Sequence, residues 1–265
     1  MTIDKKTVII TGASSGLGAE LAKQLAHKSN INLVLFSRNI EELKIVEAKC
    51  KPYNTSTLIV GGDVSRPNDC KKLIDKTIEK FESIDLLINN AGISMWTTLL
   101  ETKDLDLFDR VMRVNYLGNV YCTKYALPHL IKSNGTITCI SSIQAIIGAP
   151  HHTAYAASKA ALNAFYDSLS MELDKTVHIL TIYLGWLRGT KLRENASTAS
   201  QDYSNSNAKH ASSYSICVQE CAKKILSAIE KKKHTATIPG YLNTLRILKI
   251  LSKRTLHKLI SSNMQ

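Results

Sequence analysis

Short apolar runs alternate with longer amphipathic stretches along the first two thirds of the chain. The runs are rich in Val, Ile and Leu and nearly continuous, which is typical of strands buried on both faces. The predicted strands are Thr7–Thr11, Asn32–Ser37, Thr57–Gly61, Leu86–Asn89, Gly135–Ile140 and His178–Leu184. The predicted helices are Leu17–Lys28, Ile40–Lys51, Asn68–Phe81, Leu105–Lys132 and Tyr155–Lys175. Strands separated by helices predict right-handed βαβ units, and therefore an α/β fold whose doubly wound parallel sheet has helices on both faces.

The last third of the chain breaks this alternation. Residues 188–215 are rich in Ser, Asn, Ala and Lys without a clear period, which predicts a lid or a disordered connection. Beyond them the pattern predicts a helix at Ile216–Lys231, a strand at Thr235–Ile238 and a basic amphipathic helix at Tyr241–Ile260. We therefore expect a single domain over residues 1–240, followed by a helical tail over 241–265.

Composition is that of a folded domain in a reducing compartment. Hydrophobic residues make up 44% of the 265 residues and charged residues 21%, which is ordinary for a globular protein. No apolar run reaches the roughly 18 residues of a membrane span, and the polar N-terminus does not resemble a signal peptide. We therefore expect a cytoplasmic protein with its six cysteines reduced. No Cys/His spacing indicates a metal site.

The net charge of +12 is concentrated near the C-terminus, where residues 223–265 hold ten Lys and Arg against one acid. Basic charge attracts phosphates of cofactors, lipids and nucleic acids. Because no nucleic-acid-binding motif accompanies it, nucleic acid is not an expected partner. The tail leaves two interpretations open. It lies peripherally on an anionic membrane, or it packs its apolar stripe on the body or on a partner subunit, as most amphipathic helices do.

A glycine-rich turn follows the first predicted strand and opens into a helix. After Thr11 its residues are Gly12, Ala13, Ser14, Ser15, Gly16, Leu17 and Gly18. Glycines in this position let the backbone approach a pyrophosphate at the helix N-terminus. No Gly-Lys-Ser/Thr follows, which excludes a P-loop, so the turn predicts a dinucleotide site.

The end of the second predicted strand indicates which dinucleotide is bound. An NAD site usually has an acid there, which accepts hydrogen bonds from the ribose hydroxyls. Here Ser37 takes that position and Arg38 follows. A guanidinium binds a 2′-phosphate through paired donors, whereas a carboxylate repels it. We therefore predict NADP(H) in preference to NAD(H); the alternative is that Arg38 is an ordinary solvated surface residue.

Tyr155 and Lys159 are the candidate proton-transfer residues. Four residues apart on a predicted helix, they share a face. A neighbouring ammonium lowers the pKa of a phenol, which is ordinarily near ~10, and this suits a general acid or base. Ser141 and Ser142 end the preceding strand, and Ser142 lies thirteen residues before Tyr155.

At this point the chain resembles the classical short-chain dehydrogenase/reductase family, including its hydroxysteroid dehydrogenase-type members. The resemblance runs from residue 7 to about 190. The matching motifs are TGxxxGxG at 11–18, Asp63-Val64, Asn89-Asn90-Ala91-Gly92, Asn115, Ser142 and Tyr155 with Lys159. It implies a Rossmann-like fold with a seven-stranded parallel sheet, an NAD(P)(H) cofactor, and a homodimer or homotetramer built on the helices at Leu105–Lys132 and Tyr155–Lys175.

The resemblance also implies roles for the matched residues. Tyr155 exchanges a proton with the substrate oxygen, which Ser142 polarises. Lys159 lowers the pKa of Tyr155 and holds the nicotinamide ribose, and Asn115 supports a water relay. Spacing favours Ser142 over Ser141. The residues implied to border the cofactor are Asp63, Val64, Asn89, Ala91 and Gly92.

The sequence departs from the family pattern after the sixth predicted strand. Many members have Pro-Gly there and a Thr four residues beyond the Gly, whereas this chain has Leu184-Gly185 and places Gly189 at the Thr position. We therefore assign the nicotinamide contacts of this segment to Gly185 and the backbone of Leu187 rather than to Thr190.

The sequence thus predicts an NADP(H)-dependent oxidoreductase that interconverts a carbonyl and a secondary alcohol without a metal. Apolar residues near the site favour a hydrophobic substrate such as a steroid, retinoid, acyl chain or xenobiotic ketone. They are Ile143, Ile146, Ile147 and Trp186. His151 and His152 are either substrate contacts or exposed loop residues, and we expect the second. The alternative function is a non-catalytic NADP(H) sensor that binds a partner, against which the complete set of Ser142, Tyr155 and Lys159 argues.

Overall fold

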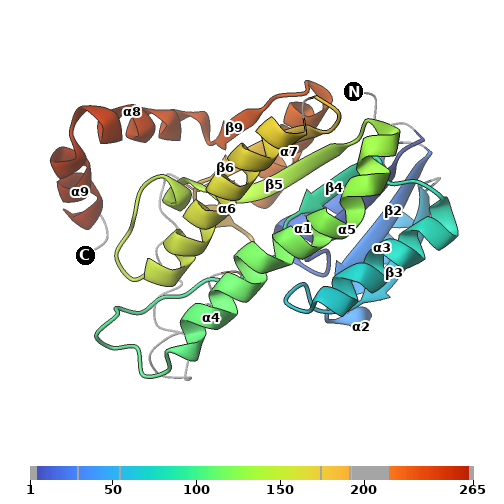
Figure 1. Ribbon diagram of the computed structural model, residues 1–265, viewed down its shortest axis with the longest axis horizontal. Coiled ribbons are helices and arrows are strands. Elements are labelled where there is room, and N and C mark those ends of the chain that lie inside the picture. The colour runs from blue at the N-terminus through green and yellow to red at the C-terminus, as the bar shows by residue number, and fades with distance from the viewer. Residues whose placement is uncertain are drawn as a thin grey trace.

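A seven-stranded sheet forms the centre of the computed structural model, which describes residues 5–28, 30–53, 55–173, 175–190, 192 and 215–262 (Figure 1). The strand order is β3-β2-β1-β4-β5-β6-β9, and every neighbouring pair is parallel. The bounds are β1 (Thr7–Thr11), β2 (Ile31–Ser37), β3 (Thr55–Gly61), β4 (Leu86–Asn89), β5 (Thr136–Ser142), β6 (His178–Leu184) and β9 (Thr235–Ile238). This arrangement confirms the predicted Rossmann-like fold.

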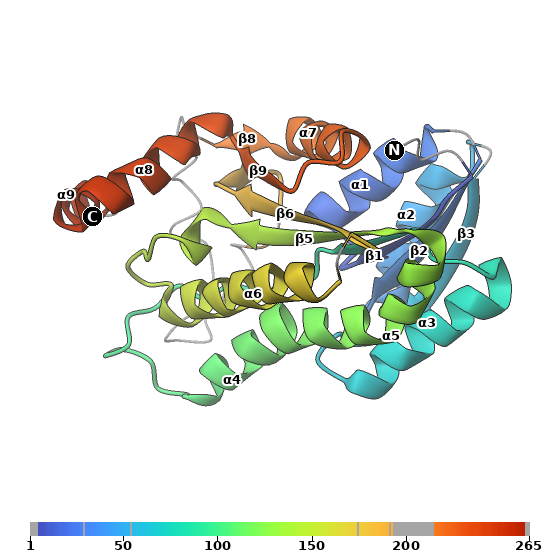
Figure 2. The same cartoon turned by 45° about the horizontal axis from the view of Figure 1, so that its top comes forward.

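Helices cover both faces of the sheet, as Figure 2 shows. One layer holds α1 (Gly16–Ala26), α2 (Ile40–Cys50) and α7 (Val218–Glu230), and the other holds α3 (Pro67–Phe81), α5 (Gly118–Ser133) and α6 (Thr153–Glu172). Successive strand residues point to opposite faces. Val8 and Ile10 of β1 therefore join the first core, while Ile9 joins the second. This two-sided burial explains why the seven strands contain no Asp, Glu, Lys or Arg and take their polar residues mainly from Thr and Ser.

The helix predicted at Leu105–Lys132 contains a π-helical turn. It comprises α4 (Asp106–Met112), the turn Arg113–Leu117 and then α5, with right-handed helical dihedrals at the junctions. Asn115 lies in this turn with its side chain buried. π-turns of this kind are frequent at functional sites.

Two very short strands were not predicted. β7 (Leu187–Arg188) pairs in parallel with β8 (Ile216–Cys217), so the helix predicted from Ile216 begins instead at Val218. The pairing joins the two ends of the segment that we predicted to be a lid. That segment lies outside the described residues, except for 188–190, 192 and 215.

The predicted single helix at Tyr241–Ile260 is divided in two. After the 3₁₀ turn Gly240–Leu242, α8 (Asn243–Leu251) ends before Ser252, and α9 (Lys253–Ser262) begins after it. Ser252 has an extended backbone (φ −156°, ψ 94°), and its Oγ accepts a hydrogen bond from Thr255 N at 3.3 Å. A serine that caps a new helix in this way ends the preceding one, although the apolar period continues.

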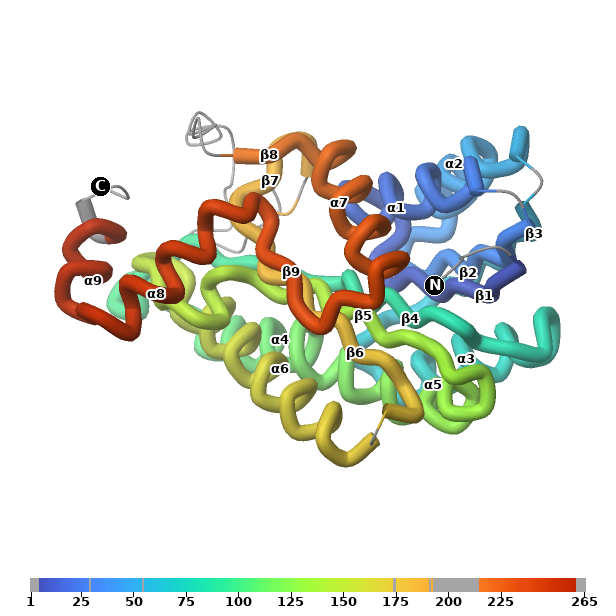
Figure 3. Tube along the Cα trace, turned by 90° about the horizontal axis from the view of Figure 1, so that it is seen from above, coloured from blue at the N-terminus to red at the C-terminus, as the bar shows by residue number. Residues whose placement is uncertain are grey.

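The tail lies at one end of the molecule (Figure 3). One of its faces packs on the body. The tail residues in the contact are Leu242, Leu245, Leu248, Leu256 and Ile260, and they pack with Ile143, Ile146 and Ile147 after β5. The packing interpretation of the tail is therefore confirmed for this face. Across the described ranges, no helix is both long and apolar enough to cross a bilayer.

Candidate active site

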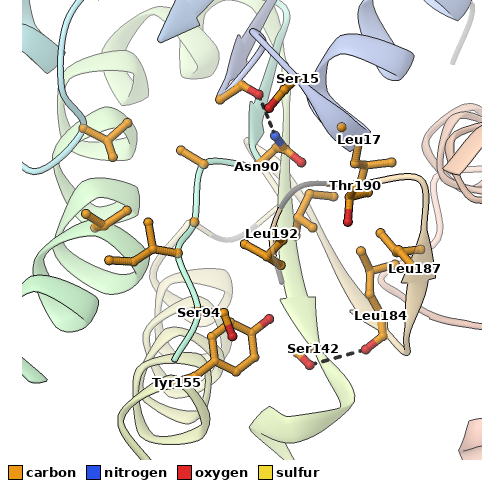
Figure 4. A pocket seen from close by; sticks show the side chains of 18 of the residues that line it. Ser15, Leu17, Asn90, Ser94, Ser142, Tyr155, Leu184, Leu187, Thr190 and Leu192 are labelled. Carbon is orange, nitrogen blue, oxygen red and sulfur yellow. Dashed lines mark hydrogen bonds between the residues drawn. The ribbon is translucent and has the colours of Figure 1, made fainter. Parts of the chain in front are cut away.

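A pocket of about 420 Å³ opens at the carboxyl ends of the central strands (Figure 4). It lies where the chain reverses direction along the sheet, between β1 and β4, which is where open α/β sheets bind ligands. The predicted cofactor and catalytic residues that line it are Gly12, Ser14, Ser15, Gly16, Leu17, Ser37, Arg38, Asp63, Val64, Ala91, Gly92, Ser142, Tyr155, Lys159, Gly185 and Leu187. Gly18, Asn89 and Asn115 are not among the lining residues.

Polar contacts between β1 and β4 hold the floor of the pocket. Thr11 Oγ1 accepts hydrogen bonds from the backbone N–H groups of Asn90 and Ala91, both at 3.0 Å. The Asn90 side chain donates in return to Thr11 O at 2.9 Å and Gly12 O at 3.3 Å. Thr11 and Asn90 were not among the predicted site residues, although both lie within the quoted motifs.

Two glycines allow these segments to approach each other. Gly12 has φ +67°, and a Cβ there would lie 2.9 Å from Ala91 Cα. A Cβ on Gly18 would lie 2.3 Å from Gly12 O and 2.7 Å from Asn90 Nδ2. Gly18 therefore acts through packing beneath the turn and does not face the pocket. Asn89 also lies behind it, where its Nδ2 donates to Thr123 Oγ1 and Tyr166 Oη.

The turn presents a helix N-terminus suited to an anion. Ser15 is the N-cap residue of α1, its side chain makes no capping hydrogen bond, and the first turn holds no acid. Helix N-termini have unpaired N–H groups and a partial positive charge. A dinucleotide pyrophosphate therefore fits this turn.

Three polar side chains come together at the end of β2. Ser37 Oγ donates to Ser14 Oγ at 2.9 Å, which joins the strand end to the glycine-rich turn. Arg38 extends beside them with 73% of its side chain exposed, and its Nη1 lies 4.0 Å from Asp63 Oδ2. Asp63 is the acid among the described lining residues, and it belongs to the loop after β3.

Ser142 and Tyr155 point into the same part of the pocket (Figure 4). Ser142 Oγ accepts a hydrogen bond from Gln144 N at 3.1 Å and donates to Leu184 O across a long 3.4 Å. Because that donated bond is weak, the Ser142 hydroxyl hydrogen is available to a closer acceptor. Ser141 instead donates to Asn163 Oδ1 on α6 at 2.8 Å.

The pKa of Tyr155 differs from the sequence prediction. Burial raises the pKa of the Tyr155 phenol above its ordinary value, and hydrogen bonding with the Ser142 hydroxyl opposes the rise. Lys159 does not supply the predicted lowering. Its Nζ donates to Ile140 O at 2.8 Å and lies 5.8 Å from the Tyr155 ring centroid, while burial lowers its own pKa. Desolvation is thus the largest cause of the pKa shift of both Tyr155 and Lys159.

Asn115 lies beneath the pocket and joins two of its walls. Its Oδ1 accepts from Ile93 N at 2.8 Å, and its Nδ2 donates to Ile93 O and to Ser158 Oγ, both at 3.0 Å. Ser158 Oγ donates in turn to Tyr155 O at 2.7 Å. The side chain therefore fixes the loop after β4 against α6, close to Tyr155.

Two buried polar residues of the pocket were not among the predicted site residues. Gln144 lines it, and among the described residues its Oε1 has no hydrogen-bond partner. The prediction that His152 is exposed was wrong. Only 7% of the residue is accessible, because its ring makes edge contacts with the rings of Trp96 and Tyr155, at 4.8 and 6.2 Å between centroids. Both residues lie in the sequence between Ser142 and Tyr155, and this position alone could have indicated that they are near the active site.

The prediction of which apolar residues shape the substrate part of the pocket was correct for one residue only. Trp186 lines the pocket, but Ile143, Ile146 and Ile147 do not, because the C-terminal tail covers them. Thr190 is also a lining residue, and its side chain lies against Gly16, where a Cβ would approach Thr190 Cβ to 3.3 Å.

Comparisons with known proteins agree with this geometry. A family model described as short chain dehydrogenase matches residues 6–201. An 11-beta-hydroxysteroid dehydrogenase of Pinus massoniana is 32% identical over 253 residues, which cover 94% of this chain and 71% of that relative. An 11-beta-hydroxysteroid dehydrogenase-like protein 3 of Arabidopsis thaliana is 34% identical over 93% of this chain and 77% of its own length.

Solved structures share the fold. An alcohol dehydrogenase of the archaeon Thermococcus sibiricus, complexed with 5-hydroxy-NADP, superposes with a TM-score of 0.76 at 21% identity. The match covers 88% of this chain and 95% of that one. At this identity the likeness concerns the fold alone.

Proposed function

Because the chain belongs to the short-chain dehydrogenase family, whose enzymes act on CH–OH groups with NAD(P), we propose that it is an NADP(H)-dependent oxidoreductase of hydrophobic carbonyl compounds and alcohols. The reaction interconverts a carbonyl and a secondary alcohol. The main support is that Tyr155 and Ser142 line the same pocket as the glycine-rich turn at the start of α1. Proton transfer can therefore occur beside a bound dinucleotide.

The described residues fit a dinucleotide along the length of the pocket. The α1 N-terminus receives the pyrophosphate, Asp63 and Val64 border the adenine, and Ala91 and Gly92 lie beside the rest of the cofactor. Gly185 and the backbone of Leu187 contact the nicotinamide, and Lys159 holds its ribose. When bound, the nicotinamide supplies or accepts the hydride.

The preference for NADP(H) follows from the end of β2. Ser14, Ser37 and Arg38 present two hydroxyls and a guanidinium at one corner of the pocket, with no acid in the position of Ser37. A 2′-phosphate makes charge-assisted hydrogen bonds with such donors. Arg38 is far enough from Asp63, at 4.0 Å, to turn toward a phosphate without breaking a close ion pair.

The chemistry requires a proton at the substrate oxygen. Tyr155 supplies it: its phenol can donate a proton to the carbonyl oxygen as hydride reaches the carbon. Burial raises the pKa of this phenol, and the hydrogen bond with Ser142 opposes the rise. Ser142 directs its hydroxyl hydrogen to the same oxygen in place of the long contact with Leu184 O. Asn115 holds α6 and the Ile93 loop in register, and it supports the route by which Tyr155 regains a proton.

The substrate is a hydrophobic carbonyl compound such as a steroid, retinoid, acyl chain or xenobiotic ketone. The support is the set of apolar side chains that line the pocket, together with relatives named 11-beta-hydroxysteroid dehydrogenase. These lining residues include Ile93, Val114, Leu184, Trp186, Leu187 and Leu192. The homodimer or homotetramer and the cytoplasmic location stay predictions.

The test is NADPH oxidation with a panel of steroid, retinoid and aliphatic ketones. Wild type should reduce at least one of them, and Tyr155→Phe should lower kcat by about 10²- to 10⁴-fold while still binding NADPH. Tyr121→Phe on α5 removes a phenol outside the pocket and should leave kcat unchanged. Unchanged turnover in Tyr155→Phe would refute the assignment. If the wild type binds NADPH tightly but reduces no ketone, the result would favour the alternative function of a non-catalytic NADP(H) sensor.

A further inference from the structure

The C-terminal tail has a second apolar face that the body does not cover. Ile247, Ile250 and Leu251 of α8 are 59%, 85% and 76% exposed, and their spacing places them on one side of the helix. We call these three residues the outer ridge. The inner face, through Leu245 and Leu248, packs beside Ile146. An aliphatic ridge on a helix already anchored by its opposite face indicates a binding surface.

The charged residues of the described tail all have one sign. The described tail, residues 241–262, contains no Asp or Glu. Arg246 lies over the Tyr183 ring and Lys249 donates to Ile146 O, so both are turned toward the body. Lys253, Arg254 and Lys258 of α9 are exposed, and no acid of the described residues forms an ion pair with them.

A second set of exposed apolar residues lacks the basic surroundings of the tail. Leu99, Leu100 and Leu105 are also exposed, but Glu101 and Asp104 lie among them. An acidic neighbourhood repels anionic lipid, so that loop is not part of the surface. In the tail, three exposed aliphatic side chains on one helix occur together with basic residues and no acid.

We propose that the tail docks the protein peripherally on an anionic lipid bilayer, with the outer ridge in the acyl boundary and Lys253, Arg254 and Lys258 at the headgroups. Amphipathic basic helices bind bilayers in this way. A second copy of the tail is a poor occupant, because the pair would bring like charges together. A nucleic acid would engage the basic residues but would leave the aliphatic ridge in water.

Docking would place the bilayer near the substrate pocket. The tail's inner face contacts Ile143 and Ile147, in the segment that follows Ser142. Leu242 packs against Gly185, where a Cβ would lie 2.5 Å from Leu242 Cδ1. In Figure 1 the tail stands at the end of the molecule toward which the strands point, which is also the end where the pocket opens. Binding to lipid does not depend on the proposed catalytic activity.

The test is co-sedimentation of the full chain with vesicles of phosphatidylcholine alone, or with about one third phosphatidylserine. Wild type should bind the anionic vesicles at low salt, bind neutral ones weakly, and be released in part by high salt. Replacing Lys253, Arg254 and Lys258 together by Gln should weaken binding by roughly 100-fold, at about one kcal/mol per charge.

The outer ridge is tested separately by Ile247→Gln, Ile250→Gln and Leu251→Gln in one variant. Its binding should fall by at least about 100-fold. Met171→Gln on α6, where the side chain is 76% exposed like Leu251, is the matched control and should bind like wild type. Circular dichroism and NADPH binding show that each variant is folded.

Three results would overturn the proposal. Wild type that stays in the supernatant with anionic vesicles at low salt would do so. So would a ridge variant that binds as tightly as wild type. The third result is that neither protein binds vesicles, while analytical ultracentrifugation shows an oligomer of the wild type that the ridge variant does not form. The outer ridge would then bind a second copy of the chain.

Discussion

Replacing Arg38 by Asp should invert the cofactor preference without destabilising the protein. In the free protein the Arg38–Asp63 contact spans 4.0 Å, and the Arg38 side chain is 73% exposed. Exposed pairs contribute about 0–1 kcal/mol, so the melting temperature should barely change. A charge-assisted hydrogen bond to the 2′-phosphate contributes about 1.5–3 kcal/mol. Exposure favours the lower end, and NADPH affinity should therefore fall by at least roughly tenfold.

The new carboxylate adds repulsion of the 2′-phosphate, while NADH affinity should stay the same or improve, because a carboxylate can accept from the ribose hydroxyls. Fluorescence titration of both nucleotides with wild type and Arg38→Asp measures the ratio of the two affinities. Arg66→Gln removes an exposed arginine that does not line the pocket, and it should leave the ratio as it is. If Arg38→Asp also leaves the ratio unchanged, Arg38 does not determine the preference for NADP(H).

Two further predictions concern the core and the glycine-rich turn. Burial raises the pKa of the Cys139 thiol from its ordinary 9.0 to about 12. Its contribution to the free energy of unfolding is thus complete below pH 9 and declines between about 9 and 12, by about 1.4 kcal/mol at pH 10. Urea unfolding of Cys139→Val should show a shallower alkaline loss, and an identical pH dependence would contradict this assignment. Gly18→Ala should lower the free energy of unfolding by about 1–3 kcal/mol and weaken NADPH binding, because its Cβ would clash with Gly12 O. Gly240→Ala, whose Cβ would meet nothing within 4 Å, is the control, and equal stability of the two variants would count against this packing.

Elements decided by local pattern were predictable from the sequence. The strand predicted at Thr7–Thr11 has the observed bounds, and so does the edge strand Thr235–Ile238. Both are short apolar or β-branched runs, and the neighbouring helices have amphipathic faces that cover the sheet. Ser142, Tyr155 and Lys159 were assigned to one site by the resemblance to the family, which rests on all the motifs in their order, and all three line the pocket.

Features that depend on distant partners were not predictable. His152 is buried because Trp96, more than fifty residues earlier, packs against it. The raised pKa of Tyr155 reflects desolvation, which no spacing reveals. The strands β7 and β8 are too short to leave a pattern and exist through their pairing. The break at Ser252 has a local cause, but the uninterrupted apolar period around it concealed the serine cap.

The central position of β1 has a consequence for synthesis of the chain. This strand is translated before the other strands of the sheet, yet it pairs with β2 on one edge and with β4 on the other, where Val8 is aligned with Leu86. At about 5–20 residues per second, roughly 3–10 s pass between translation of β2 and of β4. During that interval one edge of an apolar strand has no partner, and unpaired strand edges favour aggregation. A nascent chain of this topology should therefore depend on chaperones or on slow, cooperative closure of the sheet once β4 is complete.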